Sequence, residues 1–109
     1  MTTTISEVLV TADNPEWLTN FTRQLVEERW CACAQHTNPI RSIYWWDGAI
    51  QDETEIRAAL HTRQALVPAL IDRIKKDHPY DVASIIALPI EDANPNYVEW
   101  VEAETREAE

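Results

Sequence analysis

The side chains best suited to bind a soft metal ion lie close together, in the segment 31–36. Cys31, Cys33 and His36 occur there in the spacing Cys-x-Cys-x2-His. Thiolate and imidazole are ligands that suit Cu(I) and Zn²⁺. In an extended segment, alternation places both sulfurs on one face and His36 on the other, so a complete ligand set requires a bulge or a second subunit. The alternative is that both cysteines are small residues of the core.

Two further histidines, His61 and His78, flank the second of the expected helices. If they lie at neighbouring ends of a sheet, Asp81 is within reach, and a His–Asp pair can coordinate a metal or act as a general base. The alternative is that His78 caps the C-terminal end of that helix, where Pro79 stops it. Because no nucleophile or oxyanion donor can be named beside the pair, we expect no enzyme.

Composition excludes several classes of function. Nine Lys and Arg stand against nineteen Asp and Glu, a formal net charge of -10, which repels nucleic acid and anionic lipid. With a single glycine the chain has no glycine-rich phosphate-binding loop. The two closely spaced cysteines are not a disulfide framework, and neither a signal peptide nor a membrane-spanning stretch is visible. We therefore expect a cytoplasmic protein without nucleic acid or membrane partners.

Hydrophobic periodicity predicts alternating strands and helices. Asn14-Pro15 is a typical helix start, Asn94-Pro95 repeats it, and Asp47-Gly48 is a strong hairpin signal. The expected elements are a strand at 5–12, a helix at 15–29, a long hairpin between 31 and 60 interrupted at 38–39, a helix with Pro68 in its first turn that ends at 78, a strand at 84–90 and a helix from 95.

This order predicts an α+β fold, the ferredoxin-like βαββαβ sandwich with a long β-hairpin and an added C-terminal helix. A chain of 109 residues fits one domain, residues 1–109. Two helices are expected to cover one face of a four-stranded antiparallel sheet. The open face, and the cluster Tyr44-Trp45-Trp46 on the hairpin, are expected to form a subunit interface. Stacking of these aromatic rings on a planar ligand is the alternative.

Several segments are informative through their order and spacing along the chain. They are Val10-Thr11-Ala12, Leu25-Val26-Glu27-Glu28-Arg29, Cys33, Arg41-Ser42-Ile43-Tyr44-Trp45-Trp46-Asp47-Gly48, His78-Pro79-Tyr80, Ile86-Ala87-Leu88-Pro89-Ile90 and Asn94-Pro95-Asn96-Tyr97-Val98-Glu99-Trp100. Together, these segments resemble the CutA family of divalent-ion tolerance proteins.

The resemblance implies a homotrimer that binds copper or another divalent metal, with no cofactor required. The expected metal ligands are Cys33, Cys31, His36 and His78. The resemblance also implies an inter-subunit pocket comparable to the effector site of PII proteins, here formed by Trp46, His61, Tyr80, Asp81 and Trp100. A PII-like sensor of a small molecule and a non-catalytic trimeric scaffold are the alternatives.

The sequence departs from the usual family pattern at sites that bear on this pocket. His61 stands where the family usually has lysine, before Thr62, which is expected to open the second helix. Asp81-Val82-Ala83-Ser84 replaces the usual Glu-Val-Pro-Glu, and Gln35 replaces the asparagine that follows Cys33 by two. These changes alter the charge that the pocket offers a ligand.

Overall fold

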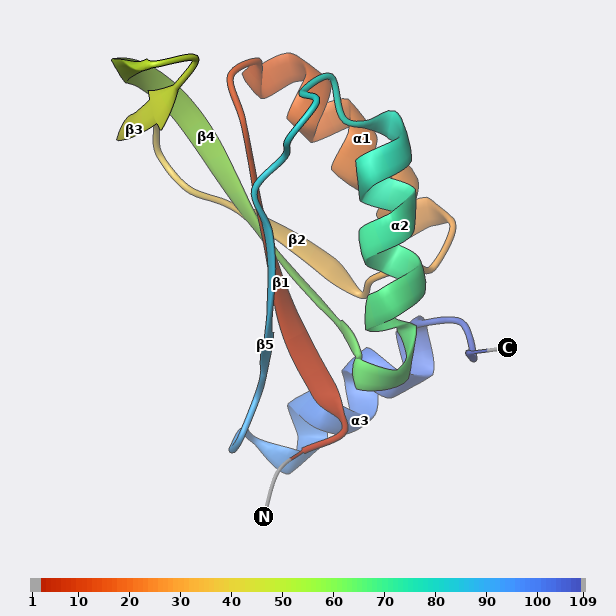
Figure 1. Cartoon of the computed structure of the whole chain (residues 1–109). Helices are drawn as coiled ribbons and strands as arrows, with labels where there is room; N and C mark the ends of the chain where they lie inside the picture. The colour runs from red at the N-terminus through yellow and green to blue at the C-terminus, as the bar shows by residue number, and fades with distance from the viewer. Residues whose placement is uncertain (1–2, 109) are drawn as a thin grey trace.

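The computed structural model describes residues 3–108 and contains five strands and three α-helices within that range (Figure 1). In chain order the elements are β1 (Ile5–Ala12), α1 (Pro15–Glu27), β2 (Cys33–His36), β3 (Ile40–Trp46), β4 (Ala49–Arg63), a short 3-10 turn (Gln64–Leu66), α2 (Val67–Asp77), β5 (Ile85–Pro89) and α3 (Pro95–Glu104).

The ends of α1 follow from its capping residues. The Asn14 side chain accepts the backbone N–H of Trp17, as the sequence predicts, and satisfies one of the unpaired donors at the start of the helix. The helix stops two residues earlier than expected, because Arg29 adopts a left-handed φ of 64°. The N–H of Arg29 then bonds the carbonyl of Val26, and that of Trp30 bonds Leu25, which is the Schellman pattern of helix termination.

The expected hairpin forms with Asp47 and Gly48 as its two turn residues, at φ of 53° and 77°, between the paired residues Trp46 and Ala49. Positive φ at both positions is what the right-handed twist of a tight hairpin requires. The incoming arm is not one strand, however. It is divided at the Asn38-Pro39 interruption into β2 and β3, so the sheet has five strands and not the four expected.

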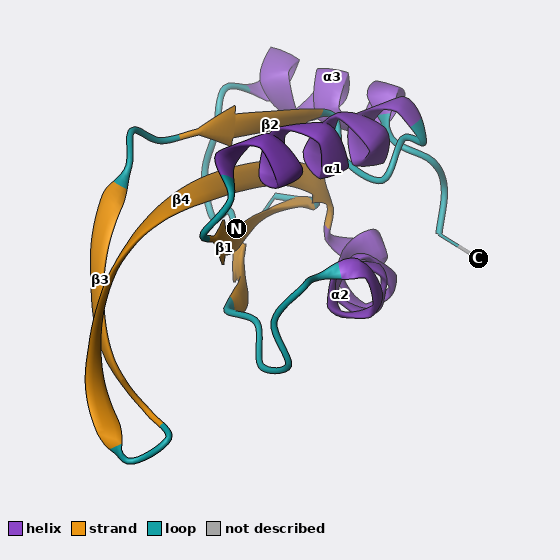
Figure 2. Cartoon of the chain, turned by 90° about the horizontal axis from the view of Figure 1, so that it is seen from above, coloured by secondary structure: helices purple, strands orange, loops and turns teal. Residues whose placement is uncertain are grey.

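Strand β4 is the longest element and organises the sheet. Its first part pairs with β3 and its second part with β2 on one edge and β1 on the other, all antiparallel. The order across the sheet is β2-β4-β1-β5. Because β4 continues to Arg63, His61 and Thr62 lie in a strand, and the prediction that Thr62 opens a helix is wrong. The β3–β4 hairpin arches away from the rest of the sheet (Figure 2).

Helices α1 and α2 lie on the same side of the sheet (Figure 1). The hydrophobic core fills the space between them and the sheet, with Val8 and Leu60 from the strands and Leu25 and Leu70 from the helices all fully buried. Pro68 falls in the first turn of α2, where its missing N–H costs no helical hydrogen bond.

The sheet face away from α1 and α2 is not left fully open, because α3 packs against β4 and β1. The rest of that face and the hairpin carry exposed apolar side chains, among them Ile86, Leu88, Ile43, Trp45 and Ile50. No helix within residues 3–108 has the length and apolar character needed to cross a bilayer.

Candidate functional site

A row of polar side chains crosses the sheet on the face opposite the hydrophobic core. Cys33 of β2 pairs with His61 of β4, and His61 pairs with Glu7 of β1. Directly paired residues of antiparallel strands project to the same face, whereas the neighbouring Leu60 points into the core. The Sγ atom of Cys33 lies 3.6 Å from Nδ1 of His61, and Glu7 Oε2 lies 3.7 Å from Nε2, the other ring nitrogen.

Helix α3 adds a phenol to this row. The Tyr97 hydroxyl lies 3.3 Å from Cys33 Sγ and forms a short hydrogen bond with Nδ1 of His61. The ring of Tyr97 meets the imidazole edge-on and stacks on Trp100 one helical turn later. Thiol, imidazole and phenol are therefore in mutual contact. We refer to Cys33, His61, Tyr97 and Glu7 as the thiol–imidazole cluster.

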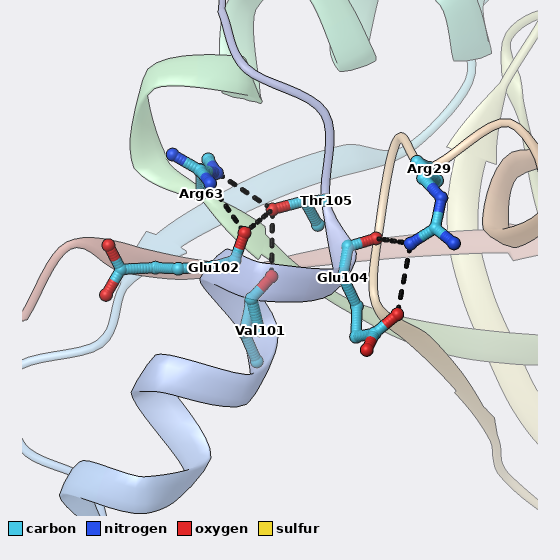
Figure 3. A network of polar contacts seen from close by, with 6 residues as sticks. All are labelled: Arg29, Arg63, Val101, Glu102, Glu104 and Thr105. Carbon is cyan, nitrogen blue, oxygen red and sulfur yellow. Dashed lines mark hydrogen bonds and ion pairs between the residues drawn. The ribbon is translucent and has the colours of Figure 1, made fainter.

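Two arginine side chains hold the C-terminal end of α3, the helix that carries Tyr97 (Figure 3). The guanidinium of Arg63, two residues after His61 in β4, donates to the carbonyl of Glu102 at 2.6 Å and to Oγ1 of Thr105 at 3.0 Å. Arg29 donates to the carbonyl and the carboxylate of Glu104. A cation at a helix C-terminus satisfies the unpaired carbonyls there. The strand that supplies the imidazole thus also anchors the helix that supplies the phenol.

The environment of the cluster lowers the pKa of Cys33 and raises the pKa values of His61 and Tyr97. Burial opposes ionisation of the Cys33 thiol, but hydrogen bonds to His61 and Tyr97 outweigh it, so the pKa of Cys33 is below its ordinary 9.0. The hydrogen bond to Cys33 raises the pKa of His61 above 6.5 against the effect of burial. Burial, followed by the bond to Cys33, raises the pKa of Tyr97. Both the lowered pKa of Cys33 and the raised pKa of His61 favour transfer of the thiol proton from Cys33 to His61.

Cys33 and His61 are the two side chains of this cluster suited to a soft metal ion. Within residues 3–108 no group of three or more His, Cys, Asp or Glu side chains converges in a metal-binding arrangement. A metal at the cluster would therefore take one sulfur and one nitrogen from these two residues, with further ligands from the Tyr97 oxygen, solvent or another chain.

The structure does not assemble the predicted set of Cys31, Cys33 and His36. Cys31 precedes β2 and is fully buried in the hydrophobic core, and its burial, aided by the nearby Cys33, raises its pKa to about 12. His36 faces away from Cys33, as alternation requires, and its Nε2 lies 2.9 Å from Oγ1 of Thr22 on α1. Both cysteines are free. Only Cys33 of this set therefore belongs to the cluster.

His78 lies elsewhere and has a structural role. It follows the last residue of α2, as the capping alternative predicts, although its side chain does not bond the last helical carbonyls. Its Nε2 instead donates to the carbonyl of Thr11 at 2.8 Å, and its Nδ1 accepts the N–H of Tyr80 at 3.0 Å. Thr11 lies four residues along β1 from Glu7, or roughly 13 Å in a strand, so His61 and His78 do not form a common site.

The five residues predicted to form one ligand pocket divide between two places in this chain. Trp46, Tyr80 and Asp81 line a groove of about 870 Å³ beneath the hairpin, together with residues of β1 and β5. In that groove the Tyr80 hydroxyl donates to the buried carboxylate of Glu55 at 3.1 Å. His61 belongs to the thiol–imidazole cluster, and Trp100 stacks on Tyr97 beside it.

Two members of the cluster, Glu7 and Tyr97, were not predicted from the sequence as site residues. Glu7 meets His61 only because β4 runs three residues beyond the expected end of the hairpin, and that extension has no turn signal of its own. Tyr97 follows the cap-and-proline start of α3 by two residues, so its place on the helix was predictable. The surface against which that helix packs was not.

Comparison with known proteins gives consistent matches across almost the whole chain. The family model described as CutA1 divalent ion tolerance protein matches residues 6–104. Protein CutA of Mus musculus is 40% identical over 97 residues, which are 89% of this chain and 55% of the mouse protein. The Oryza sativa protein named "Protein CutA 1, chloroplastic" is 38% identical over 101 residues, 93% of this chain and 57% of the rice protein. The chain thus spans little more than half the length of these two relatives.

A shorter relative matches over nearly its full length. The divalent-cation tolerance protein CutA of Pyrococcus horikoshii is 38% identical over 101 residues, 91% of this chain and 98% of that protein. The crystal structure of CutA1 from Oryza sativa is 36% identical, covers 98% of both chains and superposes with a TM-score of 0.92.

Proposed function

Because the chain belongs to the CutA1 divalent ion tolerance family, we propose that it binds copper or another divalent metal ion and thereby contributes to metal tolerance. The observation that carries the proposal is the contact between Cys33 Sγ and His61 Nδ1 at 3.6 Å. Metal bonds of about 2.3 Å to sulfur and about 2.0 Å to nitrogen, at a tetrahedral angle, place the two donor atoms roughly 3.5 Å apart. The pair is therefore spaced for one shared ion without movement of the backbone.

The surroundings of the pair support this proposal. Glu7 approaches Nε2 of His61, the nitrogen that faces away from Cys33. A carboxylate on the second ring nitrogen fixes the orientation of a metal-binding imidazole and increases its basicity. The lowered pKa of Cys33 favours the thiolate, which is the form that binds metal. Thiolate and imidazole favour Cu(I) and Zn²⁺ over Mg²⁺ or Ca²⁺.

The assembly proposed with this function is a homotrimer of one-domain, ferredoxin-like protomers. The strand order β2-β4-β1-β5, with α1 and α2 on one face, supports the ferredoxin-like assignment. Trp45 is 73% exposed and Ile43 is 64% exposed, on a hairpin that projects from the sheet, and apolar surface of this kind is typical of a subunit interface. We propose that the trimer acts in the cytoplasm and is not an enzyme.

A second candidate function, a sensor of a small molecule, rests on the groove beneath the hairpin. Its volume of about 870 Å³ suits a small ligand, and it combines apolar walls with the Tyr80–Glu55 hydrogen bond. Trp46 and Asp81, which the family resemblance implicates in ligand binding, line it. Ligand binding at this groove would leave Cys33 and His61 untouched.

Metal titration with matched variants tests the first proposal. The reduced protein is titrated with Cu(I) against a competing chelator, and separately with Zn²⁺, while binding heat and melting temperature are followed. Cys33→Ser and His61→Ala are expected to weaken binding and to abolish the metal-dependent rise in melting temperature. Cys31→Ala and His36→Ala serve as controls, since they change the other cysteine and a histidine outside the cluster. Equal binding by His61→Ala and His36→Ala would contradict the proposal.

A further inference from the structure

We propose that Cys33 is a site of reversible modification, at which its sulfur forms a mixed disulfide with a small disulfide molecule. The modification would also remove the sulfur donor from the proposed metal site, and only this regulatory consequence rests on the proposed function. The arrangement that carries the inference is the nucleophile, base and orienting carboxylate formed by Cys33, His61 and Glu7.

The cluster has the parts that thiol–disulfide exchange requires. Cys33 is partly exposed, unlike the fully buried Cys31. Nδ1 of His61 lies 3.6 Å from Sγ and can receive the thiol proton, and Glu7 faces the opposite nitrogen of the ring. An adjacent base that is itself oriented by a third group is the usual means of activating a sulfur nucleophile. The Tyr97 hydroxyl, 3.3 Å from Sγ, supplies a second hydrogen-bonding group at the reacting atom.

The exchange needs no oxidant other than the small disulfide itself. The thiol proton of Cys33 moves to Nδ1 of His61 as Sγ attacks one sulfur of the disulfide. One sulfur–sulfur bond forms to Cys33 and the original one breaks, and the departing thiolate takes the proton back from His61. The products are the mixed disulfide and one small thiol, so that atoms, protons and electrons balance.

Cys31 does not compete for this reaction in the folded protein. Its side chain is fully buried in the hydrophobic core, whereas a disulfide can reach sulfur only at the surface. Cys31 is also free rather than paired with Cys33. A mixed disulfide at Cys33 is therefore expected to persist until an external thiol reduces it, which is the behaviour of a reversible switch.

Charge indicates which small disulfide is the suitable probe. The protein has a formal net charge of -10, and Glu7 lies within the cluster. A disulfide with cationic ends is attracted to such a surface, while an anionic one is repelled. Cystamine, an aliphatic disulfide with two ammonium groups, is therefore the probe of choice.

The test follows modification of the metal-free, reduced protein by cystamine with intact-mass and peptide-mapping mass spectrometry. In the wild type, Cys33 is expected to be modified and Cys31 not, and added thiol should reverse the change. His61→Ala is expected to slow modification of Cys33 by about tenfold or more, because the adjacent base is lost. Glu7→Gln, which keeps the shape of the side chain, should slow it less and provides a second readout if His61→Ala does not fold.

Two results would overturn the inference. One is modification of Cys31 at the rate of Cys33 in the folded protein, and the other is a Cys33 rate unchanged in both His61→Ala and Glu7→Gln. Because the rates are measured without metal, neither result would bear on the proposed metal binding, which the titration decides separately. Conversely, absence of metal binding by unmodified protein would overturn the proposed function while the exchange chemistry stood.

Discussion

Cys33 and His61 are direct partners across strands β2 and β4, with Sγ 3.6 Å from Nδ1. Their contact depends on strand register, since a slip of one residue would send the two side chains to opposite faces of the sheet. The buried residues Leu60 and Ala58, which alternate with His61 on β4, fix that register by facing the core. Packing of the core therefore brings the thiol of Cys33 and the imidazole of His61, the two most reactive groups of the cluster, to the same face of the sheet.

The first prediction concerns the thiol itself. Replacing His61 with alanine removes a hydrogen bond and a positive charge that stabilise the Cys33 thiolate, so the pKa of Cys33 should rise. The thiolate absorbance in the ultraviolet, followed against pH, measures it. A Cys31→Ala background isolates the signal of Cys33. The prediction fails if the titration curves with and without His61 superimpose.

The Tyr97 hydroxyl is expected to have a separable effect. In Tyr97→Phe the ring can keep its stacking on Trp100 and its edge contact with His61, while the bonds to Cys33 and His61 are lost. We expect a loss of about 1 kcal/mol in the free energy of unfolding and a higher pKa for Cys33. Urea denaturation and the same absorbance titration measure the two effects. Tyr97→Leu, which also removes the aromatic contacts, should destabilise the protein further.

Local signals in the sequence predict most of the elements but only part of the site. Asn14, Asp47-Gly48 and Asn94 act through hydrogen bonds and φ values within a few residues, so the helix starts and the hairpin turn follow directly from sequence. The end of β4 has no such signal. The sequence predicts that His61 precedes a helix, whereas pairing with β1 extends the strand to Arg63.

The composition of the site could not be predicted for the same reason. Cys31 and Cys33 are two residues apart, yet Cys31 is buried in the core and Cys33 contacts α3, because β2 begins only at Cys33. Partners for Cys33 come from positions 7, 61 and 97, which only the sheet register and the docking of α3 bring together. The sequence supplied suitable residue types, and tertiary packing decided which of them meet.

The hairpin turn gives a prediction about backbone strain. Gly48 has a φ of 77°, and a Cβ added there would meet no atom within 4 Å. Any loss of stability in Gly48→Ala therefore comes from the left-handed backbone alone and is expected to be about 1 kcal/mol. Thermal denaturation measures this. Ala49→Ser, a small change at the adjacent exposed position, is the control and should leave the melting temperature nearly unchanged.

Arg63 is expected to couple the docking of α3 to the chemistry of the cluster. Arg63→Ala removes bonds to the Glu102 carbonyl and the Thr105 hydroxyl, which should cost about 2 kcal/mol in the free energy of unfolding, as hydrogen bonds from a charged group do. Because α3 is then held less firmly, the backbone amide hydrogens of residues 95–104 should exchange faster with solvent, and hydrogen-exchange measurements test this. Arg23→Ala, at an exposed arginine of α1, should change stability by less than about 0.5 kcal/mol.

The ion pair between Arg73 and Glu28 gives a prediction about acid stability. Arg73 Nη1 lies 2.6 Å from Glu28 Oε1, and this hydrogen bond is the main reason that the pKa of Glu28 falls from 4.5 to about 2. A carboxyl group whose pKa is lowered by folding stabilises the protein fully above its unfolded pKa and loses that contribution as pH falls through its folded value. The coupling should therefore persist at neutral pH and disappear toward about pH 2.

A double-mutant cycle with Glu28→Gln and Arg73→Ala measures this coupling through urea denaturation at several pH values. Arg73 also binds Asp77 at 2.7 Å, so a second cycle with Asp77→Asn separates that contribution. Stability of the wild type should fall more steeply than that of Glu28→Gln as pH drops from about 4.5 toward about 2, because only the wild type must protonate the paired carboxylate. Parallel pH profiles for the two proteins would show that the pair is not maintained in solution.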